Sequence, residues 1–260
     1  MQNRHTDRQL YFNEQEITTG KHVIPYIEKF MPVTPGMRIL EVGCGEGGNL
    51  KPFLARECKV TGVDISEGKI TLARNFFAAL PESARPELIC DDIYNLTPPA
   101  EKYDLVLMRD VIEHIHDQER FLFFIRQFMH KKTIFFLGFP PWQNPFGGHQ
   151  QVCRNRLLSH LPYFHLLPAA LYKAVLKMGG ESENSINSLL EIKETGLSTE
   201  HFEKIFTRAG YTRLSVSFFL INPNYEVKFG LKPVKQCGVI SRIPHLRNYF
   251  TTSVFYLLTP

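Results

Sequence analysis

Residues 39–50 combine an acidic residue with a glycine-rich turn, a pairing that is typical of ligand binding. Glu41 is followed by glycines at positions 43, 45 and 48. A strand that runs into such a turn lets backbone N–H groups approach a ligand closely, and the next helix would direct its positive end at an anion. The same glycines satisfy the dinucleotide-binding pattern G-x-G-x-x-G. The turn therefore indicates either a pyrophosphate or a different polar group.

Glu41 separates these two interpretations, because it lies two positions before the first glycine. A negative charge there would repel a pyrophosphate, whereas it suits the ammonium group of an amino-acid moiety. The alternative for Glu41 is a solvent-facing residue at the end of a strand. Asp64 ends the next predicted strand and can accept hydrogen bonds from both hydroxyls of a ribose. Asp64 can also cap the helix that is predicted to begin near Ser66.

Asp91, Asp92 and Ile93 follow the third predicted strand. A carboxylate at this place can accept a hydrogen bond from an exocyclic adenine amine, while Ile65 or Ile93 covers the face of the ring. One of the two aspartates is expected to be a turn residue only, and we favour Asp92 as the ligand. Together with the acidic residues above, this segment favours a nucleoside that carries an amino-acid tail.

Three histidines are candidates for a general base, of which His149 and His114 are favoured over His116. His114 follows the fourth predicted strand, and His149 lies in the segment 138–151 after the fifth. Open α/β sheets bind their ligands at these strand ends, and the imidazole titrates near neutral pH. The alternative for each is a neutral imidazole whose partners are backbone groups. The scattered cysteines lack the spacing of a zinc site, and we predict no metal.

The elements that position these residues follow from short apolar runs that alternate with longer amphipathic segments, the pattern of parallel strands joined by helices. The predicted strands are residues 37–42, 59–63, 87–90, 103–108, 132–139, 211–221 and 249–258. The last two are expected to form an antiparallel pair that closes the sheet. Helices are predicted over residues 49–56, from Ser66 to about Leu80, between the fourth and fifth strands, and from Ser198 to Gly210.

This order of elements divides the chain into four parts. We expect an N-terminal helical cap in residues 1–35, a ligand-binding Rossmann-like core in 36–140, an insertion or lid in 141–196, and the rest of the core sheet in 197–260. Within the insertion, residues 157–178 are either an amphipathic lid over an apolar ligand or membrane surface, or a helix pair packed on the core. We favour packing.

Composition narrows the partners and the compartment. The formal charge of +4 is mildly basic, but Lys and Arg form no dense run, so no nucleic-acid partner is predicted. The five cysteines are odd in number and scattered, which favours reduced thiols in a cytoplasm. Prolines and charged residues interrupt the longest apolar stretch, and the first residues contain no apolar signal core. We therefore expect a soluble cytoplasmic protein without stable membrane insertion.

Four segments together resemble the successive motifs of class I S-adenosylmethionine-dependent methyltransferases, of the small-molecule type that includes the ubiquinone and menaquinone methyltransferases. The segments are residues 39–47, 63–65, 91–93 and 104–115. The resemblance implies a Rossmann-like, seven-stranded, mostly parallel sheet with an antiparallel last strand and helices on both faces. It also implies S-adenosylmethionine as cofactor, bound by Glu41, Gly43, Cys44, Gly45, Gly47, Asp64, Ile65, Asp91, Asp92, Ile93, Met108 and Arg109.

The sequence thus predicts methyl transfer from S-adenosylmethionine to a small, partly apolar acceptor. The sulfonium is already activated, so alignment is the main requirement, and a base such as His149 or His114 is needed only where the acceptor must lose a proton. The Pro-Pro-Trp segment resembles the Pro-Pro-aromatic motif of amino-group DNA and RNA methyltransferases, in which Asp, Asn or Ser comes first. Phe139 stands at that position here, so nucleic acid is disfavoured as acceptor. The alternatives are a nicotinamide-dependent oxidoreductase and a non-catalytic protein that binds S-adenosylmethionine.

Overall fold

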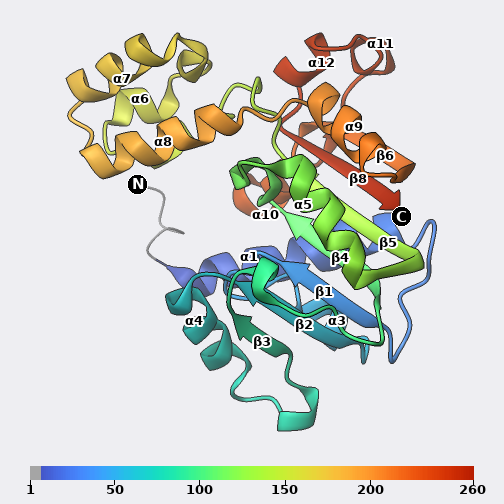
Figure 1. The fold of residues 1–260 in the computed structure, drawn as a ribbon. Coiled ribbons are helices and arrows are strands. Elements are labelled where there is room, and N and C mark those ends of the chain that lie inside the picture. Colours follow the sequence, from blue (N-terminus) through green and yellow to red (C-terminus); the bar gives the residue numbers. More distant parts are fainter. Residues whose placement is uncertain (1–6) are drawn as a thin grey trace.

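A mixed β-sheet runs through the centre of the computed structural model, which describes residues 7–260 (Figure 1). The strands lie in the order β3-β2-β1-β4-β5-β8-β6-β7. They are β1 (Arg38–Val42), β2 (Lys59–Asp64), β3 (Glu87–Cys90), β4 (Tyr103–Arg109), β5 (Met129–Phe139), β6 (Thr212–Ile221), β7 (Val234–Lys235) and β8 (Ser253–Thr259). Residues 1–6, which belong to the predicted cap, lie outside the described residues.

The pairing of the strands confirms the predicted α/β class. β1 to β5 pair in parallel, and β8 runs antiparallel between β5 and β6. The sheet contains one strand more than predicted, because the two-residue β7 pairs with the outer edge of β6. The last strand begins at Ser253 rather than Tyr249, since the residues before it form helix α12 (Leu246–Tyr249).

Helices cover both faces of the sheet. Side chains of the central strands alternate between two apolar clusters, as the period of a strand requires: Leu40 and Val106 belong to one cluster, Ile39 and Leu105 to the other. The first cluster packs against α5 (Gln118–Ile125) and α9 (Thr199–Arg208). The second packs against the described part of the predicted cap and two further helices, namely α1 (Arg8–Thr18), a π-helical turn (Thr19–Val23), α2 (Ile24–Ile27), α3 (Lys51–Leu54) and α4 (Glu67–Phe77).

Two predicted helices differ from those observed. The helix expected over residues 49–56 is the single turn α3, whose second residue is Pro52. The helix expected to run from Ser66 to Leu80 is α4, which ends at Phe77. Ser66 occupies the N-cap position of α4, but its side chain accepts no capping hydrogen bond. By contrast, α9 begins as predicted, with the Ser198 side chain accepting the N–H of His201, and it ends at Arg208, two residues before the predicted Gly210.

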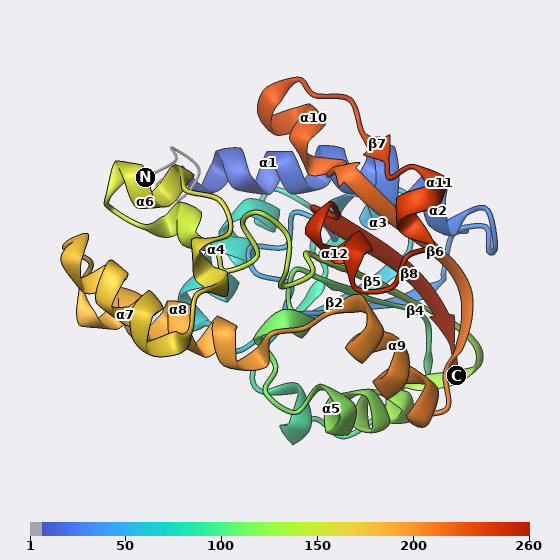
Figure 2. The same ribbon diagram turned by 90° about the horizontal axis from the view of Figure 1, so that it is seen from above.

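A small helical subdomain stands to one side of the sheet (Figures 1 and 2). It contains α6 (Arg156–His160), α7 (Ala169–Met178) and α8 (Glu183–Thr195). The subdomain has a hydrophobic cluster of its own, separate from the two clusters that pack on the sheet. Its buried members are Cys153, Leu158, Phe164, Tyr172, Leu176, Ile186 and Leu189. Two short helices complete the C-terminal part, α10 (Asn224–Phe229) and α11 (Gly238–Ser241). Within residues 7–260, no helix is sufficiently long and apolar to cross a membrane.

Candidate functional site

The glycine turn after β1 is shaped by close packing. A Cβ atom at Gly43, where φ is +72°, would lie 2.4 Å from a methyl group of Val111. A Cβ at Gly45, where φ is +55°, would meet nothing closer than the Lys69 side chain at 3.9 Å. Gly43 is therefore required by its neighbour, whereas Gly45 borders open space. A ligand can approach the backbone at Gly45.

The amide groups of this turn are engaged within the protein. Gly43 and Cys44 donate their N–H groups to the carbonyl oxygen of Val63 at 2.8 and 3.1 Å. The Gly45 N–H donates to Oδ2 of Asp64 at 2.9 Å. The following helix, α3, begins only at Lys51 and is one turn long, so the expected helix terminus at the glycine turn is not formed. These features disfavour a pyrophosphate at this position.

Glu41 is buried at the end of β1, with 1 % of its surface exposed. Its Oε1 accepts a hydrogen bond from Nδ2 of Asn49 at 2.7 Å, while Oε2 is buried with no partner among the described residues. Burial raises the pKa of this carboxyl to about 8, opposed by the Asn49 hydrogen bond and the charge of Arg109. A buried carboxyl oxygen without a donor is the group that a ligand ammonium would satisfy.

Asn49 connects Glu41 to the N-terminal helices. Its Oδ1 accepts hydrogen bonds from the Thr19 hydroxyl at 2.7 Å and from the Arg109 guanidinium at 3.1 Å. Thr19 opens the π-helical turn, a rare conformation that is frequent at functional sites. Sequence reasoning missed Asn49 and Thr19, because neither residue type signals a ligand site and their contact exists only in the folded protein.

Asp64 lies at the same end of the sheet as Glu41, as predicted. Its Oδ2 accepts the Gly45 N–H and its Oδ1 accepts the Ser66 N–H, both at 2.9 Å. Asp64 therefore closes the turn before α4. It does not cap that helix as predicted, because its oxygen accepts the N–H of Ser66, the N-cap residue, and not that of a residue in the first turn. Its negative charge contributes to the raised pKa of Glu41. Ile65, directly after it, is 77 % exposed, an unusual exposure for a large aliphatic side chain.

Asp91 and Asp92 both take part in the turn after β3. Oδ1 of Asp91 accepts the Asp92 N–H and an amide hydrogen of Asn95, each at 2.7 Å. Oδ1 of Asp92 accepts the Tyr94 N–H at 3.0 Å. Both aspartates are exposed, whereas Ile93 is buried in the hydrophobic core. Of the two isoleucines considered for the face of a ring, only Ile65 offers an exposed surface.

Three other predicted ligand residues serve packing: the side chains of Cys44 and Met108 are buried, and Gly47 lies against Phe77. Cys44 and Met108 each belong to a hydrophobic cluster of the core, and burial raises the pKa of the Cys44 thiol. A Cβ on Gly47 would lie 2.8 Å from the ring of Phe77, so Gly47 serves packing. Cys44 and Met108 therefore have little side-chain surface to offer to a ligand, and their backbone groups are what adjoins the turn and the end of β4.

Tyr11 is a further residue of the site that sequence reasoning missed. It lies on α1, and burial together with the charge of Asp110 raises its pKa to about 12. Arg109 and Glu46 also act on its hydroxyl electrostatically, and Arg8 lies over its ring at 4.9 Å. Arg8 also pairs with Glu46. The N-terminal helix thus adds a phenol and a salt bridge to the group around the glycine turn.

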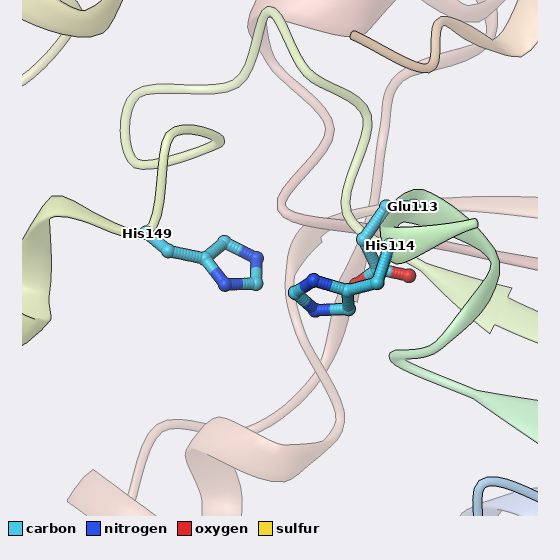
Figure 3. A group of neighbouring side chains, drawn as sticks. All are labelled: Glu113, His114 and His149. Atoms are coloured by element: carbon cyan, nitrogen blue, oxygen red, sulfur yellow. The ribbon is translucent and has the colours of Figure 1, made fainter. Parts of the chain in front are cut away.

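The side chains of His114 and His149 lie close together, beyond the carboxyl ends of β4 and β5. Their rings lie 5.1 Å apart, centroid to centroid, in an edge-to-face arrangement, and Glu113 lies beside them (Figure 3). Glu113 and His114 belong to a 3-10 turn after β4, and His149, with φ of +55°, comes from the loop after β5. The two predicted bases are therefore brought together from segments far apart in the sequence.

The electrostatic environment keeps both imidazoles neutral. Burial lowers the pKa of His149 to about 4, with smaller contributions from His114 and His165. Burial also lowers the pKa of His114, against the opposing effect of Asp110. Both oxygens of Glu113 are buried without a hydrogen-bond partner among the described residues, and burial raises its pKa. One ligand atom from each of Glu113, His114 and His149 lies within 4.8 Å of the others, a set of donors that divalent transition metals accept.

Trp142, in the same loop as His149, connects the subdomain to the core. Its backbone N–H donates to the Leu197 carbonyl oxygen at 2.9 Å, and the centroids of its ring and the His165 ring lie 4.6 Å apart. The Lys193 ammonium lies 5.3 Å from the centre of the indole. On the other side of the loop, the Thr195 hydroxyl donates to the Glu113 carbonyl oxygen at 2.5 Å. The loop and the end of α8 thus fix the subdomain beside the histidines.

The strand order and the polar residues at the ends of β1, β2 and β4 define a Rossmann-like α/β protein whose sheet carries an antiparallel strand between β5 and β6. Residues 17–168, more than half of the chain, match a family model described as a methyltransferase domain. The chain therefore belongs to the methyltransferase-domain family.

Comparisons with individual proteins agree with this family. The ubiquinone biosynthesis O-methyltransferase of Coxiella burnetii (strain RSA 493 / Nine Mile phase I) is 36% identical over 100 residues, which are 38% of this chain and 41% of that protein. The corresponding enzyme of Rhodopseudomonas palustris (strain BisB18) is 36% identical over 92 residues, 34% of this chain and 33% of that protein. The similarity thus spans less than half the length of these relatives.

Solved structures of methyltransferases share the fold. The plantazolicin methyltransferase BpumL in complex with SAH superposes with a TM-score of 0.55 and 14% identity, covering 99% of this chain and 86% of that protein. The magnesium protoporphyrin IX methyltransferase ChlM from Synechocystis PCC 6803 with bound SAH gives a TM-score of 0.56 and 15% identity, covering 100% and 88%. At such identities the likeness establishes the fold alone.

Proposed function

We propose that this chain transfers the methyl group of S-adenosylmethionine to a hydroxyl group of a small, partly apolar acceptor. The observation that carries the proposal is the buried Oε2 of Glu41, which lacks a hydrogen-bond partner among the described residues beside an open glycine turn. A ligand with an ammonium group satisfies this oxygen, whereas a pyrophosphate would be repelled. The bound SAH in solved structures of the same fold supports the same cofactor.

The described residues suit each part of this cofactor. Glu41 would hold the ammonium group, and Arg109, which lies in the same network, would face the carboxylate. Asp64 retains lone pairs for the ribose hydroxyls beyond its two backbone contacts. Ile65 offers an exposed aliphatic face to the adenine, and Asp92 its carboxylate. When bound, the cofactor supplies an electrophilic methyl group on a positively charged sulfur.

The two histidines account for the acceptor side of the reaction. A hydroxyl must lose its proton to become a good nucleophile, and the neutral rings of His149 and His114 each have a nitrogen lone pair to receive it, although burial makes both weaker bases than a free imidazole. We assign His149 as the base and His114 as the ring that orients it. The relatives are O-methyltransferases of ubiquinone biosynthesis, which supports a hydroxyl acceptor with an apolar part. The insertion 141–196 would cover this acceptor.

Calorimetric titration tests the cofactor assignment against the oxidoreductase alternative. We expect SAH to bind at micromolar concentration and NADH not to bind. Binding of NADH without SAH would overturn the proposal. Release of SAH with a panel of catechols and phenols then tests the activity. Tight SAH binding without turnover of any acceptor class would favour the alternative of a non-catalytic binding protein.

We also keep the cytoplasm as the proposed compartment and propose no nucleic-acid partner. The five cysteines are free thiols, two of them exposed, as expected for a reducing environment. Two of the basic residues near the glycine turn have partners within the protein, Arg8 with Glu46 and Arg109 with Asn49. They are therefore unsuited to contact a phosphate backbone.

A further inference from the structure

The helical subdomain exposes aliphatic side chains that its own core does not need. Met178 is 88 % exposed and Leu157 is 74 % exposed, whereas Leu158 and Leu176 beside them are buried in the subdomain cluster. Lone exposed aliphatic residues are common on protein surfaces, so their significance depends on whether they lie together and on the charges around them.

Leu157 and Met178 lie at one edge of the subdomain, where α6 begins and α7 ends. The Asn155 side chain donates a hydrogen bond to the Gly179 carbonyl oxygen at 3.0 Å. A Cβ on Gly179 would lie 2.3 Å from a methyl group of Leu158. These contacts join the residues immediately beside Leu157 and Met178. Leu161 and Leu171, each at least 40 % exposed, add to the apolar surface of α6 and α7.

The charge around this edge has a positive excess, from Arg154, Arg156 and Lys177 against Glu181 and Glu183. Oε1 of Glu181 accepts the Asn155 N–H at 2.8 Å. Residues 120–180 contain no Asp or Glu. Arg154 and Arg156 flank the start of α6, are exposed, and have no carboxylate within ion-pair distance among the described residues. Lys177 adjoins Met178, although it pairs with Glu183 at 2.8 Å. The edge therefore combines exposed aliphatic side chains with two arginines that form no ion pair among the described residues.

We infer that this edge, formed by Leu157, Met178, Arg154 and Arg156, docks on an anionic phospholipid surface. Aliphatic side chains enter the boundary between headgroups and acyl chains, while arginines remain at the negatively charged headgroups. A protein interface of similar size would be expected to present Trp or Tyr anchors, and none of the large side chains exposed on this subdomain is aromatic. Docking needs no membrane-spanning helix and is independent of methyl transfer.

The placement of the edge suits an apolar acceptor. The loop 138–151 and the Thr195–Glu113 hydrogen bond connect the subdomain directly to the histidine pair. A subdomain that rests on a bilayer would hold the mouth of the sheet near the membrane surface, where partly apolar molecules concentrate. This consequence rests on the proposed function, whereas the docking itself does not.

Co-sedimentation with vesicles tests the inference. We expect the full chain to pellet with vesicles that contain phosphatidylglycerol and to remain in solution with phosphatidylcholine alone. The variant Leu157→Asp/Met178→Asp should bind about tenfold more weakly, because it places carboxylates at the apolar surface. The variant Arg154→Glu/Arg156→Glu should lose about tenfold through its charge. Val239→Asp is the matched control, since Val239 is 74 % exposed on α11, outside the subdomain.

The outcomes separate docking from misfolding. Unchanged thermal melting and SAH binding of the double variants show that the fold is retained. Equal pelleting with both vesicle types, no pelleting with either, or an equal loss in Val239→Asp would overturn the inference. Loss of vesicle binding with retained SAH binding supports it, and a lack of SAH binding by the wild type would contradict only the proposed function.

Discussion

The two halves of the site are built in different ways. At the ends of β1 and β2, Glu41 and Asp64 lie beside the glycine turn. The amide groups of that turn donate hydrogen bonds to the Val63 carbonyl oxygen and to Asp64. At the ends of β4 and β5, His114 and His149 meet although they come from segments far apart in the sequence. Rigid, local construction suits a ligand that is always the same, whereas a loop and a separate subdomain suit one that differs between family members.

The largest expected effect lies in the histidine half. Replacing His149 with Ala should lower kcat about 100- to 1000-fold with a hydroxyl acceptor, because a neutral base is lost. SAH affinity should stay within twofold of the wild type. His201→Ala, at an exposed position on α9, is the control. If a chelator lowers kcat of the wild type as much as the substitution does, the Glu113, His114 and His149 cluster acts through a metal ion instead.

The next effect concerns the cofactor half. Glu41→Ala should weaken SAH binding about 100-fold, because truncating one partner of a buried charged pair leaves the other unpaired. The exposed Glu82→Ala provides the control. Calorimetry measures both. An affinity within threefold of the wild type in Glu41→Ala would show that the ammonium group binds elsewhere, and the contrast between the two halves would lose its basis.

The pH dependence of binding sharpens the same contrast. Glu41 has a pKa of about 8 in the free protein, and a bound ammonium group favours its ionised form. SAH should therefore bind about tenfold more weakly at pH 6.5 than at pH 8, with release of a proton at the lower pH. Titrations in buffers of different ionisation enthalpy measure that proton. His149, with a pKa of about 4, should remain neutral over this range, so kcat should show no matching step.

The smallest effect concerns packing of the turn. Gly43→Ala places a Cβ against Val111 at positive φ and should lower Tm by about 5–10 °C. Gly36→Ala reports the backbone strain alone, since φ is +82° there and no atom lies within 4 Å, and about 2–4 °C is expected. Differential scanning fluorimetry distinguishes the two. An equal loss in both variants would mean that Val111 yields without cost.

Local patterns in the sequence predicted the sheet well. β3 has the predicted bounds, and β2 and β4 differ by one residue at one end, because apolar runs and turn residues are properties of short segments. The helix after the glycine turn was overestimated, since Pro52 and the packing of the turn leave only α3. Tyr249 was assigned to the last strand because its aromatic side chain suits a strand as well as the helix that it joins.

The candidate site was predictable only where it is local. Glu41 and Asp64 could be found because each lies within one residue of the end of a strand and two residues before a glycine or the N-cap of a helix. Asn49 and Thr19 could not, since their hydrogen bond depends on how α1 and the π-helical turn settle over the sheet. His114 and His149 were each predicted, but their contact and the approach of Glu113 depend on the loop after β5.

The separate hydrophobic cluster of the subdomain bears on how such proteins diversify. Because Phe164, Tyr172, Ile186 and their neighbours pack on one another, replacements there leave the sheet and its cofactor half undisturbed. The subdomain is joined to the rest of the protein by the hydrogen bonds of the Trp142 backbone N–H to Leu197 and of the Thr195 hydroxyl to Glu113. If the proposed function holds, replacements in this cluster would change the acceptor side of the site while Glu41 and Asp64 keep their surroundings.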